Sequence, residues 1–136
     1  MNVQPSALSL ALIALLGLIN FGRGAIHILA PDGGLTMIAG LDTAAAPDLA
    51  LTLIASVGAG QIAFGLVDVA AVTRYRTFVR PLLLIHLAQA ALAVFLLFVW
   101  RPFAHDVPGQ WGALAAFVII GFFTALEYSR KSDAPA

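Results

Sequence analysis

Residues 7–30 read ALSLALIALLGLINFGRGAIHILA, an almost continuous apolar run. Three further apolar runs follow at residues 49–72, 81–100 and 111–128. A helix that crosses a hydrocarbon core needs about 20 mostly apolar residues, and each run is close to that length. The sequence therefore predicts an all-α integral membrane protein, a single domain over residues 1–136 with four antiparallel transmembrane helices.

The composition supports a membrane location. The chain is 61% hydrophobic and 10% charged, with a mean hydropathy of +0.97. A soluble domain of 136 residues could not bury that much apolar surface. The formal net charge is zero, which speaks against a nucleic-acid partner. The chain contains no cysteine, so disulfides, thiolate metal sites and iron–sulfur clusters are excluded.

The connections between the runs carry turn and helix-start signals. The sequence PDGG at residues 31–34 ends the first helix. Residues 35–41 are too short to span and predict a short interfacial helix or a re-entrant turn. Asp48 is a possible cap of the second helix. The short link 74–77 makes helices two and three antiparallel neighbours, and Pro81 suits the first turn of helix three.

Basic residues predict the orientation in the membrane. Most of those near helix ends gather at the second link and the C-terminal tail: Arg74, Arg76, Arg80, Arg130 and Lys131. Only Arg101 marks the other side. Because cytoplasmic ends carry an excess of Lys and Arg, both termini are expected in the cytoplasm. Trp100 and Trp111 then lie together at the outer interface, and Tyr75 and Tyr128 at the inner one, as interfacial aromatic belts do.

Two polar stripes follow the first two helices with the same spacing of three, four and three residues. Their members are Gly17, Asn20, Gly24 and His27, then Gly58, Gln61, Gly65 and Asp68. Residues so spaced share one helix face. Small residues there let two backbones approach closely, and polar side chains bond across the gap. Packing alone is therefore the plainest interpretation of Asn20, Gln61 and Gln89.

An inner-side polar cluster is predicted from depth along the helices. Asp68 and His86 each lie five residues, roughly 7–8 Å, from the cytoplasmic ends of adjacent helices. They are therefore expected within hydrogen-bond reach, with Glu127 approaching from the same side and Arg74 and Arg80 at the mouth. The pair is either a satisfied buried contact that fixes helix register or a proton relay.

An outer-side candidate binding group is centred on Arg23, about 10 Å from the outer end of the first helix. His27 lies one turn nearer that surface. Arg23 either snorkels outward as a structural residue, pairs with a protein group such as Asp48 or Asp106, or binds a ligand. The group comprises Arg23, His27, Asn20, Gln61 and Gln89.

Histidine positions argue against metal and haem. His27 and His86 differ in depth by on the order of 15 Å, too far for two ligands of one iron. His27 and His105 could share an outer-surface metal, but no carboxylate–histidine spacing supports it. No nucleophile–histidine–carboxylate order, phosphate loop or HExxH sequence is present. No metal, cofactor or catalytic residue is predicted.

The layout resembles a set of small four-helix bacterial inner-membrane proteins, a domain of unknown function distantly similar in plan to the DoxX-like group. The shared features are Arg23 in the first helix, the PDGG turn, the sequence IAGLD at residues 38–42, and residues 61–66 in a glycine-rich second helix. The resemblance implies the four-helix fold and a bacterial inner membrane. It carries no activity.

Three functions stay open at this point. The leading expectation is a non-enzymatic accessory or scaffold subunit that packs on other membrane subunits or a second copy, or binds a lipid-like molecule between its helices. The alternative is a small oligomeric proton-coupled transporter or channel. The third is an enzyme acting on a lipid or quinone, with Asp68, His86 and Glu127 as acid–base groups.

Overall fold

The computed structural model describes residues 4–103 and 106–130. They form four long helices, α1 (Ala7–Leu29), α2 (Pro47–Thr73), α3 (Val79–Phe95) and α4 (Pro108–Ser129). A 3₁₀ turn, Arg76–Phe78, leads into α3, and a π-helical turn, Leu96–Trp100, continues it. Counting α3 with its two flanking turns, all four have the length and apolar composition of membrane spans. The predicted four-helix membrane fold is confirmed.

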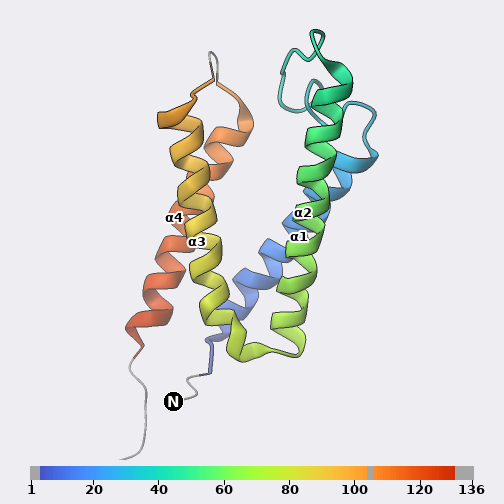
Figure 1. The fold of residues 1–136 in the computed structure, drawn as a ribbon. Helices are drawn as coiled ribbons and strands as arrows, with labels where there is room; N and C mark the ends of the chain where they lie inside the picture. The colour runs from blue at the N-terminus through green and yellow to red at the C-terminus, as the bar shows by residue number, and fades with distance from the viewer. Residues whose placement is uncertain (1–3, 104–105, 131–136) are drawn as a thin grey trace, which may run out of the picture.

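The helices form two antiparallel hairpins, α1–α2 and α3–α4 (Figure 1). Most helix–helix contacts lie within a hairpin, and few join one hairpin to the other. The hairpins meet at the end that holds the start of α1, the α2–α3 link and the end of α4, here called the terminal end. They diverge toward the opposite, loop end (Figure 1). Thus α2 and α3 run antiparallel as predicted, but each packs mainly on its hairpin partner.

Glycine explains why α1 and α2 pack so closely. A Cβ atom added at Gly24 would lie 2.7 Å from the Gly58 carbonyl oxygen, and one at Gly17 would lie 2.9 Å from Asp68 Cβ. Only glycine fits at such positions without a shift of the backbone. The two predicted stripes therefore face each other, as expected from their spacing.

The buried core lies at the terminal end, where three helices converge. Its members are Leu12, Ile13, Ala71, Val79, Leu82 and Leu83. Ile13, Val79 and Leu83 are fully inaccessible. These side chains come from α1, α2 and the start of α3, so they hold the two hairpins together at this end.

Local sequence accounts for the helix ends. The Ser6 side chain caps α1 by accepting a 3.1 Å hydrogen bond from the Ser9 N–H. Proline opens α2 at Pro47 and α4 at Pro108, since the first helical N–H has no partner to lose. The prediction that Asp48 caps α2 is wrong: it lies in the first turn, where its charge suits the positive end of the helix dipole.

The connection between α1 and α2 folds as successive turns around Asp32 rather than as the short helix considered for residues 35–41. The Asp32 carboxylate accepts hydrogen bonds from the N–H groups of Gly34 at 2.9 Å and Met37 at 2.7 Å. Gly34 and Gly40 have φ angles of 78° and 67°. Those left-handed conformations interrupt a right-handed helix, which is why the segment forms turns.

Candidate functional site

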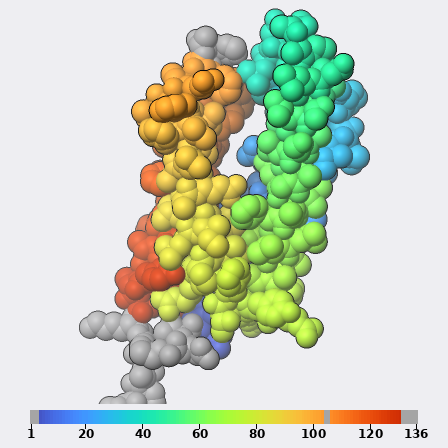
Figure 2. Space-filling model, in the orientation of Figure 1, coloured from blue at the N-terminus to red at the C-terminus, as the bar shows by residue number. Residues whose placement is uncertain are grey.

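Two cavities lie between the hairpins, one near the middle of the helices and one toward the loop end, where the space-filling view shows the halves separating (Figure 2). The deeper cavity, ≈ 160 Å³, is lined by α1, α3 and α4. The outer cavity, ≈ 280 Å³, is lined by residues from α1, α2, the π-helical turn, α4 and the two connections at the loop end. Arg23 lines both, so the cavities adjoin at its side chain.

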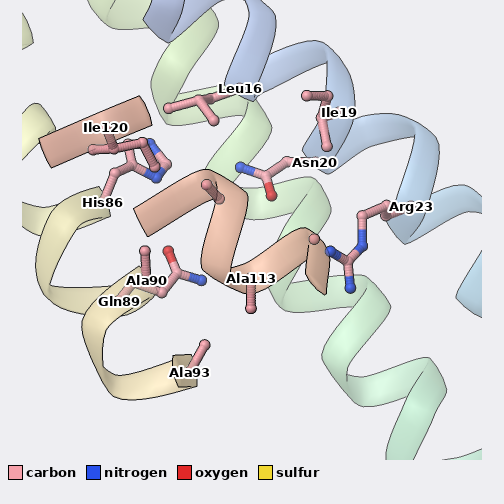
Figure 3. A pocket seen from close by; sticks show the side chains of 12 residues that line it. Leu16, Ile19, Asn20, Arg23, His86, Gln89, Ala90, Ala93, Ala113 and Ile120 are labelled. Atoms are coloured by element: carbon pink, nitrogen blue, oxygen red, sulfur yellow. The ribbon is translucent and has the colours of Figure 1, made fainter. Parts of the chain in front are cut away.

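The deeper cavity combines polar side chains with small residues. Asn20 and Arg23 reach it from α1, and His86 and Gln89 from α3 (Figure 3). Much of the remaining wall consists of residues with little or no side chain: Ala90, Ala93, Gly112, Ala113 and Ala116. The space exists because these positions on α3 and α4 do not fill it.

Asp68 and His86 form a buried pair beside this cavity. His86 Nε2 lies 2.8 Å from Asp68 Oδ1, and the two residues are 4% and 0% exposed. Asn20 Nδ2 donates to Asp68 Oδ2 at 3.3 Å, and the Phe64 ring packs on the imidazole at 5.9 Å. The predicted hydrogen bond is present. Because both carboxylate oxygens have partners, Asp68 is a satisfied buried acid held between three helices.

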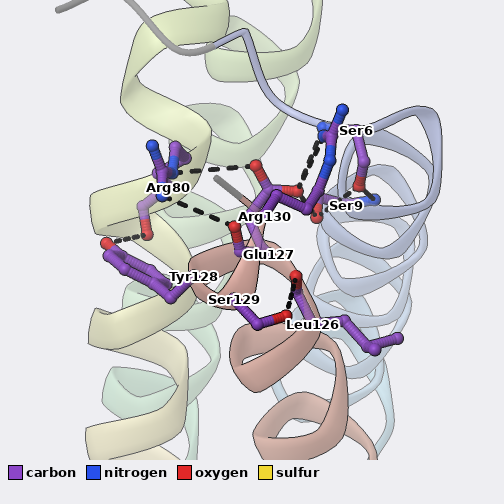
Figure 4. Close-up of polar contacts among 8 residues, drawn as sticks. All are labelled: Ser6, Ser9, Arg80, Leu126, Glu127, Tyr128, Ser129 and Arg130. Atoms are coloured by element: carbon purple, nitrogen blue, oxygen red, sulfur yellow. Dashed lines mark hydrogen bonds and ion pairs between the residues drawn. The ribbon is translucent and has the colours of Figure 1, made fainter. Parts of the chain in front are cut away.

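Glu127 lies apart from that pair, so the predicted cluster of three is wrong. Glu127 Oε2 accepts hydrogen bonds from Ser9 Oγ at 2.7 Å and Ser6 N at 3.0 Å (Figure 4). Its carboxylate also lies 3.7 Å from Arg80 Nε on α3. Arg80 precedes His86 by six residues, about 9 Å along a helix. The core side chains lie at intermediate positions along α1 and α3, so two separate polar sites result.

The basic residues at the terminal end accompany Glu127. Arg80 donates to the Glu127 carbonyl oxygen at 3.4 Å, and its guanidinium lies 4.7 Å from the centre of the Tyr128 ring. Arg130 lies 3.7 Å from the Glu127 carboxylate. Arg74 is exposed beside the Tyr75 ring. Lys131 lies outside the described residues. Arg80 thus serves the Glu127 site rather than the mouth of an Asp68–His86 site.

Arg23 has no protein partner in the part of the chain that the structure describes. No hydrogen bond or ion pair joins its guanidinium to Asp48, Asp106 or Gln61 there. Its side chain extends from α1 toward the space between the hairpins (Figure 3). Of the interpretations considered from sequence, pairing with a protein side chain is not observed.

The other residues of the predicted outer-side binding group lie in three different environments. His27 Nδ1 donates to the Gly33 carbonyl oxygen at 2.7 Å and so ties the α1–α2 connection to α1, while it also lines the outer cavity. Gln89 is an exposed residue that lines the deeper cavity with Asn20. Gln61 lines neither cavity, and its Oε1 atom is buried with no hydrogen-bond partner among the described residues.

Sequence reasoning missed Gln110, which is 5% exposed and lines the outer cavity. Its Oε1 accepts from the Val107 N–H at 3.1 Å, and its Nε2 donates to the Leu97 carbonyl oxygen at 3.1 Å. It therefore joins the start of α4 to the π-helical turn of α3. The signal was a glutamine at the third position of a helix opened by Pro108, where its side chain can accept from the N–H of the cap residue, as the glutamine of a capping box does.

The described residues do not gather into a metal site. No group of three His, Asp or Glu residues suited to a metal occurs within residues 4–103 and 106–130, and His105 lies outside them.

Comparisons with protein-family models, curated proteins and solved structures found no match to this chain. The resemblance to the DoxX-like group therefore stays a prediction.

Proposed function

We propose that this protein is a non-enzymatic membrane-embedded binding protein that holds an amphipathic, lipid-like molecule between its two hairpins. The observation that carries the proposal is Arg23, a charged side chain within a membrane span that has no protein partner among the described residues and lines both cavities. A charge at such depth is costly unless it has a partner or reaches water.

The shape and lining of the cavities suit a ligand with a polar head and an apolar body. Together the two volumes fall within the roughly 300–1,000 Å³ of typical small-molecule pockets. Polar groups concentrate in the deeper cavity. The outer cavity is walled mainly by apolar side chains, including Leu35, Ile54, Val57, Leu97 and Phe103. An amphiphile would offer a partner to Arg23 and cover these walls at the same time.

The cellular setting is part of the proposal. We infer a bacterial inner membrane with both termini in the cytoplasm, from the basic residues at the terminal end and the resemblance to the DoxX-like group. The protein would act as an accessory subunit whose partners are membrane lipids and either other membrane subunits or a second copy. In this orientation the outer cavity and Arg23 lie in the outer half of the bilayer, and the deeper cavity extends from Arg23 across the middle to His86.

Native mass spectrometry in mild detergent tests the binding function. The wild-type protein is expected to retain a lipid-like mass, and Ala116→Phe, which fills the deeper cavity, is expected to lose it. Ala115→Phe is the matched control, because Ala115 is exposed and does not line the cavity. Ala93→Phe repeats the test from α3. Equal retention by both cavity-filling variants, or a wild-type protein that binds no amphiphile, would contradict the proposal.

A second function, proton-coupled transport, is favoured by one observation. His86 lines the deeper cavity while its Nε2 is hydrogen-bonded to the fully buried Asp68. A titratable pair is thereby in contact with the candidate ligand site, as proton relays require. In proteoliposomes, a pH gradient would then drive ligand flux that Asp68→Asn abolishes while binding persists. Flux unaffected by the gradient would leave binding as the better proposal. An enzyme using Asp68, His86 and Glu127 together is not proposed, because these residues do not converge.

A further inference from the structure

The cavities between the hairpins carry an unbalanced positive charge. Among the described residues, the titratable ones that line them are Arg23 and His86 in the deeper cavity and Arg23 and His27 in the outer one. No aspartate or glutamate within residues 4–103 and 106–130 lines either cavity. Arginine stays protonated at any physiological pH, so the charge on Arg23 cannot be relieved by losing a proton.

Among the described residues, no ion pair joins Arg23 to Asp48 or Asp106, and three other carboxylates are already engaged. Asp68 accepts from Asn20 with one oxygen and contacts His86 with the other. Asp32 accepts backbone hydrogen bonds within the α1–α2 connection. Glu127 lies at the terminal end with Arg80. Arg23 is therefore left without a carboxylate within the part of the chain that the structure describes.

Resting on the proposed binding function, we propose that the ligand has an anionic headgroup, a carboxylate or a phosphate, which pairs with the Arg23 guanidinium at the junction of the two cavities. The planar guanidinium offers parallel N–H donors that match either group in a bidentate contact. Arg23 is exposed between the hairpins, and at its depth in a span the effective dielectric constant is lower than in water, which strengthens such an ion pair.

The surrounding side chains select a compact acidic headgroup. The amide of Gln89 and the side chain of Asn20 line the same space as Arg23. His86 Nδ1 makes no hydrogen bond to any described residue, since the contact to Asp68 uses Nε2. These groups can complete the hydrogen bonds of a carboxylate or phosphate. The deeper cavity measures ≈ 160 Å³, which is enough for either group.

Binding measurements with amphiphiles of equal chain length test whether the site prefers an anionic headgroup. Palmitic acid and palmitoyl lysophosphatidic acid represent the carboxylate and the phosphate, and monopalmitoylglycerol is the neutral reference. Each would be titrated into the full-length protein in a non-ionic detergent, with bound ligand counted by native mass spectrometry. At least one acid is expected to bind about tenfold or more tightly than the neutral reference, and the stronger acid identifies the headgroup.

Variants of Arg23 test whether this residue provides the preference for an anionic headgroup. Arg23→Gln is expected to bring the affinity for the acid down to that of the neutral reference, and Arg23→Lys to retain part of the preference. Arg101→Gln is the matched control, because Arg101 is an exposed arginine at the loop end that lines neither cavity. If Arg23→Gln does not fold, Arg23→Lys and the acid-to-neutral ratio of the wild-type protein still decide the question.

Different results would contradict the proposed binding function and the proposed anionic headgroup. Equal affinity for acidic and neutral amphiphiles, with binding abolished in Ala116→Phe, would overturn the anionic headgroup but keep the binding function. The same holds if Arg23→Gln and Arg101→Gln bind the acid equally well. Failure of every amphiphile to bind the wild-type protein would overturn both.

Discussion

The side chains of Asp68 on α2 and His86 on α3 meet at 2.8 Å, although these two helices share few other contacts. The pair lies beside the deeper cavity, which His86 lines, and Asn20 of α1 bonds the same carboxylate. It therefore links both hairpins through one buried acid.

Removal of either partner of this pair is expected to destabilise the protein strongly. A buried ion or acid left without its partner typically costs about 3–5 kcal/mol. Asp68→Ala and His86→Ala should each lower the unfolding free energy by about that amount, measured by denaturation in mixed micelles. The double variant should lose clearly less than the sum, because the single variants share one interaction. A coupling energy indistinguishable from zero would show that the contact contributes nothing to the fold.

The glycine contact between α1 and α2 gives a matched pair of variants. At Gly24 an added methyl group would lie 2.7 Å from the Gly58 carbonyl oxygen, whereas at Gly22 nothing lies within 4 Å. Gly24→Ala is therefore expected to lose about 1–3 kcal/mol through forced separation of the helices. Gly22→Ala should be neutral or slightly stabilising, because alanine favours the helix. Thermal unfolding of both variants in one detergent measures the difference, and equal stability would refute the close approach.

Hydropathy and proline positions were enough to predict the four helices, because spanning length and helix-breaking residues act locally. The starts of α2 and α4 fell two and three residues earlier than the apolar runs, at Pro47 and Pro108. Proline is tolerated at the first helical position, but it does not count as part of an apolar run. The apolar runs alone therefore place these two helix starts too late. Helix rise likewise placed Asp68 and His86 at matching depth, and the predicted contact is present.

The environment of Glu127 could not be predicted in the same way. Depth along a helix follows from a fixed rise per residue, but the partners of a side chain also depend on how helices rotate and diverge. Ser6 and Ser9 contact Glu127 only because α1 crosses near the end of α4 at the terminal end. No sequence period encodes that crossing. The divergence of the hairpins, which creates the cavities, was missed for the same reason.

Glu127 is expected to be a strong structural determinant at the terminal end. It is 1% exposed, accepts the 2.7 Å hydrogen bond from Ser9 Oγ, and lies beside two arginines. Glu127→Ala would leave Arg80 without its countercharge and should cost about 3–5 kcal/mol. Ser9→Ala removes one hydrogen bond and should cost about 1–3 kcal/mol. Asp68→Asn, at the other polar site, keeps the shape of the side chain but removes its charge. Its unfolding free energy would be compared with that of Glu127→Ala in the same assay. A Glu127→Ala protein as stable as wild type would contradict this assignment.

Asp32 should make the α1–α2 connection sensitive to acid. Hydrogen bonds from the N–H groups of Met37, Gly34 and Thr36 hold the pKa of the Asp32 carboxyl below its ordinary value of 3.8. A carboxyl with a lowered pKa stabilises the folded connection above its unfolded pKa, and that stabilisation is lost as the pH falls through the folded pKa. In NMR spectra, the amide signals of Met37 and Gly34 should therefore shift with a midpoint below 3.8. The same signals in Asp32→Ala should not titrate, and a midpoint above 3.8 in the wild type would contradict the bonding.

Single cysteines can test the proposed orientation directly, because the chain has no cysteine of its own. Ala45 in the α1–α2 connection and Thr77 in the α2–α3 link are both exposed. These two segments lie at opposite ends of the bundle (Figure 1). Arg74, Arg76 and Arg80 flank or lie near Thr77, so that end is expected in the cytoplasm. A membrane-impermeant maleimide added to intact cells should label Ala45→Cys, and should label Thr77→Cys only after permeabilisation. The reverse pattern would invert the orientation and move Arg23 and the outer cavity to the cytoplasmic half of the bilayer, where the anionic ligand would have to come from the inner leaflet.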